Sequence, residues 1–357
     1  MSIAQAPSKI ISRLATFGFA LGLWALASGC SLARPQELSY AGPEIQLVRE
    51  FRLVRPGSDE PRKLFNHIVG LGPVLEWSPD GEQVLVDREQ GQFYLADPET
   101  GELGDCLTCG MPDARTVHFS PDGKLVAIGD DSGLYLTDLA GGSPTKLADI
   151  PWPDWIDWSP DGSQIVFSAR GSEGGAALIN IYLFDLEAVE LTNLTVGKGT
   201  ENSEFFSPRW SPDGTQIAFH GLSSDGFDIM LIQPDGSNFR ELTDWDFRGE
   251  AFFPGTAMPP QWSPDGERLA FLSYVDQGVQ SNAEIFVIGT DGSDRENLTQ
   301  SPGADRNPQW SSNGRLIAFV SYRDGDGEIY IMDSDGSNPT NVSNSSITDE
   351  LIPFWRP

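Results

Sequence analysis

The stretch Trp210-Ser211-Pro212-Asp213-Gly214-Thr215-Gln216-Ile217-Ala218-Phe219 contains the local pattern that decides the fold. In Ser-Pro-Asp-Gly, proline presets φ, aspartate caps a turn through its side chain, and glycine accepts a left-handed conformation. A short apolar strand follows directly. An aromatic residue before a tight turn and an apolar strand after it together predict a β-hairpin.

The pattern recurs along the chain. It starts at Trp77, Phe119, Trp158, Trp210, Trp262 and Trp310, and a seventh aromatic start, Phe354-Trp355-Arg356-Pro357, ends the chain. These starts lie 39 to 52 residues apart. Each hairpin precedes a loop, an alternating strand such as Glu328–Asp333, and a second turn such as Asp335-Gly336. Four antiparallel strands at this repeat length predict an all-β propeller, because one blade alone cannot bury its two faces.

The number of blades depends on the two ends of the chain. Trp355 supplies one further first strand, and the segments 44–50, 51–55 and 62–65 offer its three partners. Pairing N- and C-terminal strands in one sheet would remove the edges that an open ring exposes. We therefore expect seven blades closed in this way, with a six-bladed ring as the alternative.

The repeats resemble the WD40-like Pro-Asp (PD40) repeats of TolB and related propellers. The resemblance covers about residues 45–357, with Phe119 replacing Trp and Ser312-Asn313 replacing Pro-Asp as departures. The same repeat builds the propellers of prolyl-oligopeptidase-type peptidases, tricorn-like proteases and oligogalacturonate lyases. The resemblance implies the fold and leaves the function open. A TolB-like role would also require an N-terminal α/β domain, for which residues 31–44 leave no room.

The N-terminus has the features of an export signal. Lys9 and Arg13 precede an uncharged stretch from Leu14 to Gly29, which is shorter than the about 20 residues of a spanning helix. Leu26-Ala27-Ser28-Gly29-Cys30 resembles a bacterial lipobox, in which the cysteine becomes lipidated, although Ala27 stands where Leu is usual. The alternative is an ordinary signal-peptidase site after Ala25-Leu26-Ala27. We expect a signal peptide at 1–29, a tether at 30–43 with lipidation at Cys30, and one propeller at 44–357.

The charge balance restricts the partners. The chain has 23 Lys and Arg against 52 Asp and Glu, a formal net charge of −29. Nucleic acid and anionic lipid headgroups need a basic face, so neither is expected as a direct partner. The lipid anchor would be the only membrane contact. A protein, or a cell-wall or glycan component, remains as partner, and we expect a monomer on the periplasmic side of an outer membrane or at a cell surface.

The loops indicate where binding would occur. The Ser-Pro-Asp-Gly and Asp-Gly turns are short and similar, whereas the connections at the opposite end of the strands are long and varied, as in Thr243–Pro260. Variable loops on a rigid scaffold are a common binding arrangement. Exposed aromatic residues would be the anchors. The candidates are Phe205, Phe206, Trp245, Phe247, Phe252, Phe253 and Tyr322, with packing of the loops onto the blades as the alternative role.

Two local motifs suggest further chemistry. Cys106-Leu107-Thr108-Cys109 would form a disulfide if a turn brings the thiols together, and two buried thiols or a redox or metal role are the alternatives. Asp324, Asp326 and Glu328 alternate with glycines, as in loops that bind Ca²⁺. The rest of an EF-hand loop is missing, so a solvated turn is preferred and no cofactor or metal is expected, with weak Ca²⁺ binding as the alternative.

No catalytic constellation is evident. The three histidines, His67, His118 and His220, are scattered, and no G-x-S-x-G elbow occurs. Aspartates such as Asp161 and Asp213 recur at this position in five of the six repeats, so we interpret them as turn residues. The sequence therefore favours an exported, lipid-anchored binding scaffold at the cell envelope over an enzyme. The alternative is a carbohydrate-active lyase or hydrolase with its site in the propeller channel.

Overall fold

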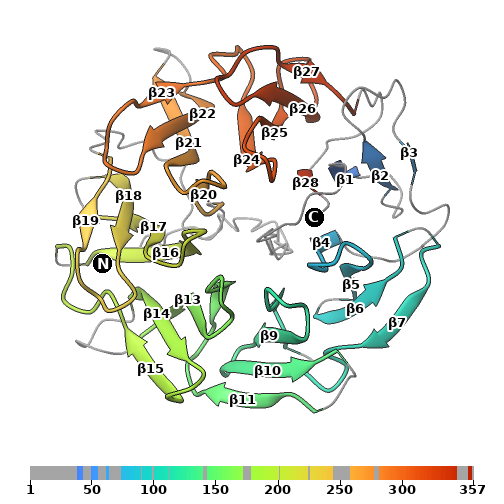
Figure 1. Ribbon diagram of the computed structural model, residues 1–357, viewed down its shortest axis with the longest axis vertical. Coiled ribbons are helices and arrows are strands. Elements are labelled where there is room, and N and C mark those ends of the chain that lie inside the picture. The colour runs from blue at the N-terminus through green and yellow to red at the C-terminus, as the bar shows by residue number, and fades with distance from the viewer. Residues whose placement is uncertain are drawn as a thin grey trace, which may run out of the picture.

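The computed structural model describes residues 38–42, 50–54, 62–63 and 74–355, with gaps at 90, 99, 112, 140–142, 172–177, 201, 224–225, 244–257, 277–280 and 344–352. The described part is built of β-strands, and no helix in it is long and apolar enough to cross a membrane. The strands form antiparallel four-stranded sheets arranged in a ring around one axis (Figure 1). The predicted all-β propeller of four-stranded antiparallel blades is confirmed.

Six blades each consist of four consecutive strands, and we number them along the chain. Blade 1 has β4 (Val74–Trp77), β5 (Val84–Glu89), β6 (Gln92–Ala96) and β7 (Leu103–Cys106); blade 2 has β8 (Thr116–Phe119), β9 (Leu125–Gly129), β10 (Leu134–Asp138) and β11 (Thr145–Ala148); blade 3 has β12 (Asp154–Trp158), β13 (Gln164–Arg170), β14 (Ile179–Asp185) and β15 (Glu190–Asn193).

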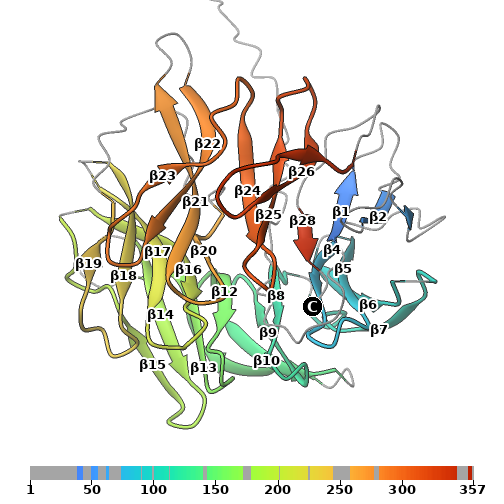
Figure 2. The same ribbon diagram turned by 45° about the horizontal axis from the view of Figure 1, so that its top comes forward.

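The second half of the chain continues the same arrangement. Blade 4 has β16 (Glu204–Trp210), β17 (Ile217–Leu222), β18 (Phe227–Ile232) and β19 (Arg240–Glu241); blade 5 has β20 (Gln261–Trp262), β21 (Arg268–Asp276), β22 (Ser281–Gly289) and β23 (Glu296–Asn297); blade 6 has β24 (Asp305–Trp310), β25 (Leu316–Ser321), β26 (Glu328–Asp333) and β27 (Thr340–Asn341). In every blade the first strand lies nearest the axis (Figures 1 and 2).

The two ends of the chain meet in one further four-stranded sheet, which we call the closing sheet. It contains β28 (Pro353–Trp355), β1 (Leu38–Gly42), β2 (Glu50–Val54) and β3 (Arg62–Lys63), in that order. Leu38 pairs with Trp355, so the N-terminal strand lies beside the C-terminal one. Six blades each come from one continuous segment, which agrees with the six-bladed alternative, and the predicted count of seven blades is not confirmed.

The first strand of the closing sheet lies earlier than expected. Sequence analysis places a strand at 44–50 and a tether at 30–43, whereas the strand occupies Leu38–Gly42, inside the predicted tether. β1 pairs with β2 through Gly42↔Glu50, leaving residues 43–49 as their connection. A strand at 44–50 would leave no residues for a turn before the strand at 51–55, and an antiparallel pair needs at least a short turn.

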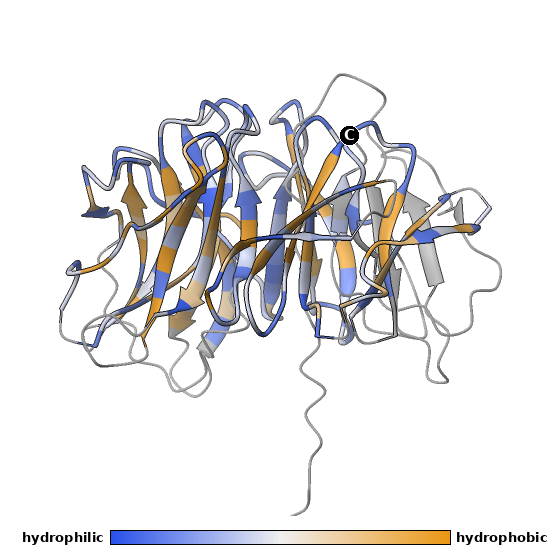
Figure 3. Cartoon of the chain, turned by 90° about the horizontal axis from the view of Figure 1, so that it is seen from below, coloured by the Kyte–Doolittle hydropathy of each residue, from blue (hydrophilic) through white to orange (hydrophobic). Residues whose placement is uncertain are grey.

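The apolar core lies between the blades. Trp158, for example, packs with Ile165 and Phe167 of its own blade and with Leu134 and Ala148 of blade 2. Equivalent clusters join each pair of successive blades from blade 1 to blade 6, and the cluster on the outer face of blade 6 includes Trp355. Figure 3 shows apolar residues along the strands and hydrophilic residues in the loops at the ring's two faces. Each blade thus needs both neighbours to bury its faces.

The repeat aromatics also make a directional contact. The indole Nε1 of Trp262 donates to the carbonyl of Arg209 in the preceding blade at 3.1 Å, and Trp158, Trp310 and Trp355 make the same bond to His118, Gln261 and Gln309. Trp355, 3.0 Å from the Gln309 carbonyl, therefore docks as the inner strands of the blades do. Where it occurs, this bond specifies the position of a sheet relative to the blade before it.

The Ser-Pro-Asp-Gly turns contact one another around the ring. Gly214 has φ of +71°, and a methyl group on it would lie 3.5 Å from Pro160 Cδ in the preceding blade. The same glycine–proline proximity links the other successive blades, through Gly123, Gly162, Gly266 and Gly314. In blade 6, Ser312 stands in place of this proline. Asn313 replaces the aspartate but still accepts from Ser311 Oγ and Arg315 N, both at 3.0 Å.

Because neighbouring strands are antiparallel, two turns of each blade lie at the same end: the turn between the first and second strands and the turn between the third and fourth strands. We call this end the short-turn face. The opposite end, with the connections between the second and third strands and between successive blades, is the long-loop face. Predicted candidate positions such as Phe205, Phe206 and Tyr322 lie toward the long-loop face because they begin inner strands or follow second strands.

We expect Trp355→Phe to lower the free energy of unfolding by about 1 kcal/mol, the usual contribution of one hydrogen bond. Phe119 shows that a phenyl ring fits this position of the repeat. Trp355→Ala should cost about 3 kcal/mol, because the packing against blade 6 is lost as well. Trp152→Phe, at an exposed position, is the control. Urea unfolding measures all three, and equal stability of the Trp355 variants and wild type would contradict the ring closure described above.

Candidate functional site

Two of the predicted aromatic anchors lie in the core. Phe205 is 3% exposed and packs edge-to-face on Phe219, with ring centroids 5.7 Å apart; Phe206 is 2% exposed and packs on Phe227. The prediction that they are surface anchors is wrong. Both belong to β16, an inner strand, and neighbouring blades cover both of its faces, so consecutive side chains are buried.

The remaining predicted anchors divide into two groups. Tyr322 is half-buried against the blade 6 core, and the Arg306 guanidinium lies 5.8 Å from its ring centroid. Trp245, Phe247, Phe252 and Phe253 fall outside the described residues. The described long-loop face therefore offers Tyr322 alone of the predicted set, already in contact with a cation.

Hydroxyl groups fix the long-loop face to the blades. In five blades, the hydroxyl of a Thr or Ser just after the fourth strand accepts a backbone N–H of the third strand and donates to an oxygen nearby. We call this the hydroxyl bridge. Thr195 Oγ1, for example, accepts from Ile181 N and donates to Asn180 Oδ1, each at 3.0 Å. The other hydroxyl bridges are those of Thr108, Thr243, Thr299 and Ser343.

The hydroxyl bridge accounts for the position of Glu328, one of the three carboxylates considered as possible Ca²⁺ ligands. Glu328 is 3% exposed and accepts from Ser343 Oγ, so it faces the blade interior. Asp324 instead accepts from the Tyr330 hydroxyl, and burial, together with this carboxylate, raises the Tyr330 pKa to about 12. Asp324, Asp326 and Glu328 do not converge on one point, and the described part of the chain contains no group of three or more His, Cys, Asp or Glu placed to hold a metal ion.

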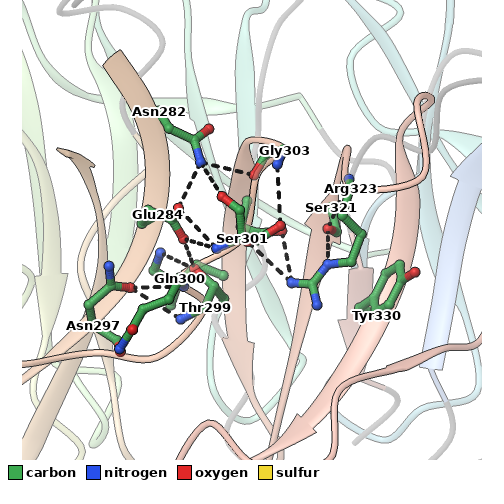
Figure 4. Close-up of polar contacts among 12 residues, drawn as sticks. Asn282, Glu284, Asn297, Thr299, Gln300, Ser301, Gly303, Ser321, Arg323 and Tyr330 are labelled. Atoms are coloured by element: carbon green, nitrogen blue, oxygen red, sulfur yellow. Dashed lines mark hydrogen bonds and ion pairs between the residues drawn. The ribbon is translucent and has the colours of Figure 1, made fainter. Parts of the chain in front are cut away.

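A polar network joins blades 5 and 6 at the long-loop face (Figure 4). Glu284 is 1% exposed and accepts from Asn282 Nδ2 at 2.7 Å and from Ser301 N at 3.1 Å. Asn282 also donates to the Ser301 and Gly303 carbonyls, which ties the connection between the blades to β22. Burial raises the Glu284 pKa. The carboxylate therefore organises a loop from inside the protein.

The adjoining part of the network is an ion pair. Asp305 has no exposed surface and accepts from Arg323 Nη2 at 3.2 Å through both carboxylate oxygens. Arg323 Nε donates to Ser321 Oγ at 2.7 Å, and its guanidinium lies 4.6 Å from the Tyr330 ring centroid. Burial raises the Asp305 pKa despite the arginine. The planar guanidinium thus bridges strands β24, β25 and β26.

A second set of ionisable residues lies on the inner strands. Glu76 Oε2 lies 3.4 Å from His118 Nδ1 and accepts from Phe119 N at 3.3 Å. Between blades 3 and 4, Asp157 Oδ1 accepts from Arg209 Nη1 at 3.2 Å, and Asp157 Oδ2 accepts from Trp210 N at 2.7 Å. All of these side chains are buried, and burial raises the Glu76 pKa. We call these the axial pairs.

Sequence reasoning missed the axial pairs, although a signal was present. Each of their residues directly precedes the repeat aromatic, and Gln261 and Gln309 hold the same position in blades 5 and 6. Phe119 has no indole N–H, and Trp210 Nε1 makes no hydrogen bond. At those two blades a carboxylate from the preceding blade accepts the aromatic residue's own backbone N–H instead. The axial pairs therefore substitute for the missing indole bonds.

The connection from blade 2 to blade 3 presents an aromatic side chain to solvent. Trp152 is 49% exposed, whereas the repeat tryptophans Trp77, Trp158, Trp210, Trp262 and Trp310 are at most 8% exposed. Asp154, two residues on, is exposed, yet desolvation by the surrounding protein raises its pKa. Its Oδ1 accepts from Trp155 N at 2.9 Å. Aromatic and carboxylate are thus both presented to solvent here.

Cys106 and Cys109 form a disulfide, with their Cα atoms 5.6 Å apart. A turn after β7 brings them together, in which Met111 N donates to Thr108 O at 2.8 Å. Thr108, between the cysteines, is also the hydroxyl bridge of blade 1. The disulfide therefore closes the loop that carries this bridge.

Comparisons with known proteins agree with the fold. Residues 248–353 match the TolB beta propeller domain (PD40) family. "Uncharacterized protein Atu1656" of Agrobacterium fabrum is 28% identical over 236 residues, 62% of this chain and 74% of that protein. The Tol-Pal system protein TolB of Thioalkalivibrio sulfidiphilus is 33% identical over 88 residues, 24% of this chain and 18% of TolB.

A solved structure extends the likeness to most of the chain. The oligogalacturonate lyase of Vibrio parahaemolyticus superposes with a TM-score of 0.65 at 14% identity, covering 86% of this chain and 89% of the lyase. At this identity the likeness concerns the fold alone. The family match thus covers residues 248–353, and the propeller fold extends over the described chain.

His220 gives the site region a pH dependence. It is buried, its Nε2 lies 2.9 Å from Met258 O, and burial lowers its pKa to about 4. The folded protein thus binds a proton less readily than the unfolded chain, so stability is lost as pH falls from 6.5 toward 4. Over this range we expect wild type to lose roughly 3 kcal/mol more than His220→Gln does. Urea unfolding at several pH values measures this, and parallel curves would contradict it.

Proposed function

We propose that this protein is an exported, lipid-anchored propeller that binds a protein, or another component of the cell envelope, on its long-loop face. The observation that carries the proposal is the repeated hydroxyl bridge. It fixes the end of the fourth strand to the third strand in the same way in five blades, while the connecting segments differ in sequence. A preorganised base under variable loops reduces the ordering cost of binding.

Export and anchoring are supported by the N-terminal sequence. The basic residues, the uncharged stretch and Leu26-Ala27-Ser28-Gly29-Cys30 lie outside the described residues, so this part of the proposal rests on sequence. β1 begins at Leu38, which leaves residues 31–37 between a lipidated Cys30 and the propeller. Fully extended, seven residues span about 25 Å. An anchored propeller would therefore stay close to its membrane.

The buried ionisable groups support binding over catalysis. In the axial pairs and in the network of Figure 4, each carboxylate accepts backbone or side-chain donors from a neighbouring strand or blade. These bonds hold sheets and connections together. Within the described residues, His118 and His220 belong to different blades and are both buried.

One observation favours an enzyme as the second candidate. Asp154 is exposed and its pKa is raised, and the electrostatic effects of His118 and Arg115 act on it. A carboxyl group of this kind, among other ionisable groups, is a feature of acid–base sites. If the protein were a carbohydrate-active enzyme, Asp154 would be its proton donor.

Cys30→Ala tests the anchor. We expect wild type to incorporate radiolabelled palmitate and to sediment with membranes, and the variant to do neither, because the thiol is the acylation point. Cys109→Ser, which removes a cysteine from the propeller, is the matched control and should remain membrane-bound. Sedimentation of the Cys30 variant with membranes would contradict the lipid anchor.

The binding face can be tested with two matched labels. Val196→Cys lies on the long-loop face of blade 3 and Val189→Cys on its short-turn face; these valines are 56% and 71% exposed. Each variant receives a polyethylene-glycol maleimide and is used to capture proteins and glycans from solubilised envelope. We expect the label at Val196 to block capture and the label at Val189 to leave it unchanged.

The opposite dependence on the two labels would contradict the choice of face. If neither variant nor the unlabelled protein captures anything, the binding proposal fails. A glycan-degradation screen then decides the enzyme reading, with Asp154→Asn as the variant that should lose activity.

A further inference from the structure

Trp152 has the property expected of the predicted aromatic anchors, because its ring is exposed on the surface. It lies between Pro151 and Pro153 in the connection from β11 to β12, on the long-loop face. Its side chain is 49% exposed, and its backbone has φ of 54°, which bulky residues rarely adopt. An apolar ring and an unfavourable backbone conformation in one residue both cost free energy in the free protein, and such strain concentrates at binding sites.

The backbone under Trp152 is held firmly. A methyl group at Gly129 of β9 would lie 2.6 Å from Pro153 O and 2.6 Å from Thr116 Cγ2. The connection therefore lies directly against blade 2, at a place where only glycine leaves room for it. The flanking prolines restrict the backbone further. Trp152 is thus presented on a fixed support.

Carboxylates outnumber cations around this support. Arg115 donates through Nε to Asp131, and Asp131, Asp154 and Asp113 all act to raise the Arg115 pKa. One guanidinium thus lies among three carboxylates. The nearby Lys146 Nζ is paired with Asp149 Oδ1 at 2.5 Å and adds no net charge.

We propose that Trp152 and Asp154 form a docking point for a lysine or arginine side chain in an exposed segment of a partner protein. The inference rests on the proposed function and specifies the partner's chemistry. A cation over the indole face is attracted by the ring electrons, and tryptophan is the strongest of the aromatic residues in this role. The Asp154 carboxylate completes the contact through a charge-assisted hydrogen bond. The overall charge of −29 draws such a segment toward the protein.

The test uses the exported full chain in detergent and a synthetic peptide of alternating Arg and Ser, at about 0.15 M salt so that long-range attraction is screened. Calorimetry gives the affinity, and the tryptophan emission of the protein reports burial of Trp152. We expect Trp152→Ala to weaken binding about tenfold and Asp154→Asn about fivefold, within the range of a partly desolvated cation–π contact and a charged hydrogen bond. Trp152→Phe should retain part of the affinity.

Val189→Ala, an exposed apolar residue on the short-turn face, is the matched control and should bind as wild type does. Circular dichroism and urea unfolding establish that each variant is folded. A peptide of alternating Glu and Ser should not bind.

Equal affinity of wild type and Trp152→Ala for the arginine peptide would overturn the proposal, since only general attraction to an acidic protein would remain. Binding of a neutral oligosaccharide that is lost in Trp152→Ala, without peptide binding, would overturn it in favour of sugar stacking. If envelope capture remains sensitive to the label at Val196 but not to Trp152→Ala, the proposed function stands and this inference fails.

Discussion

The contact between one inner strand and the next is the constraint on which the whole ring depends. Each repeat places an aromatic side chain between two blades, and in blades 3, 5 and 6 and in the closing sheet its indole N–H bonds to a carbonyl of the blade before. Burial of the ring supplies the free energy, and the single directional bond fixes the relative position of the blades. Where the indole bond is missing, at Phe119 and Trp210, a buried carboxylate takes its place. The axial charges are thus part of the framework.

The turns and the long-loop face follow from this constraint. With the inner strands in place, the glycine of each Ser-Pro-Asp-Gly turn comes against the proline of the previous turn. At the other end, the hydroxyl bridges fasten the connections, and carboxylates such as Glu284 and Glu328 serve them from inside the blade. Acidic residues at this face therefore include structural acceptors, and Glu328 is one of them.

Aromatic residues near the start of inner strands differ in how much of their surface is exposed on the long-loop face. Phe205 and Phe206 begin an inner strand and are covered from both sides, whereas Trp152 precedes one and is exposed. Two prolines and a left-handed backbone hold Trp152 outside the inter-blade layer. A neighbouring carboxylate, Asp154, remains in contact with solvent, so this connection combines the properties expected of a binding surface.

The amino-acid sequence by itself determined the repeat, the four-stranded blades and the closure of the ring by its two ends, because turn chemistry and alternation are local properties. It also placed the two cysteines where a turn brings them together. Only the tertiary structure decided that the first strand lies at Leu38–Gly42, since its register depends on β2 and β28 together. The same holds for the axial pairs and for the burial of Phe205 and Phe206. Both arise between blades about 40 to 50 residues apart in sequence, and no local pattern states which side chains meet across that distance.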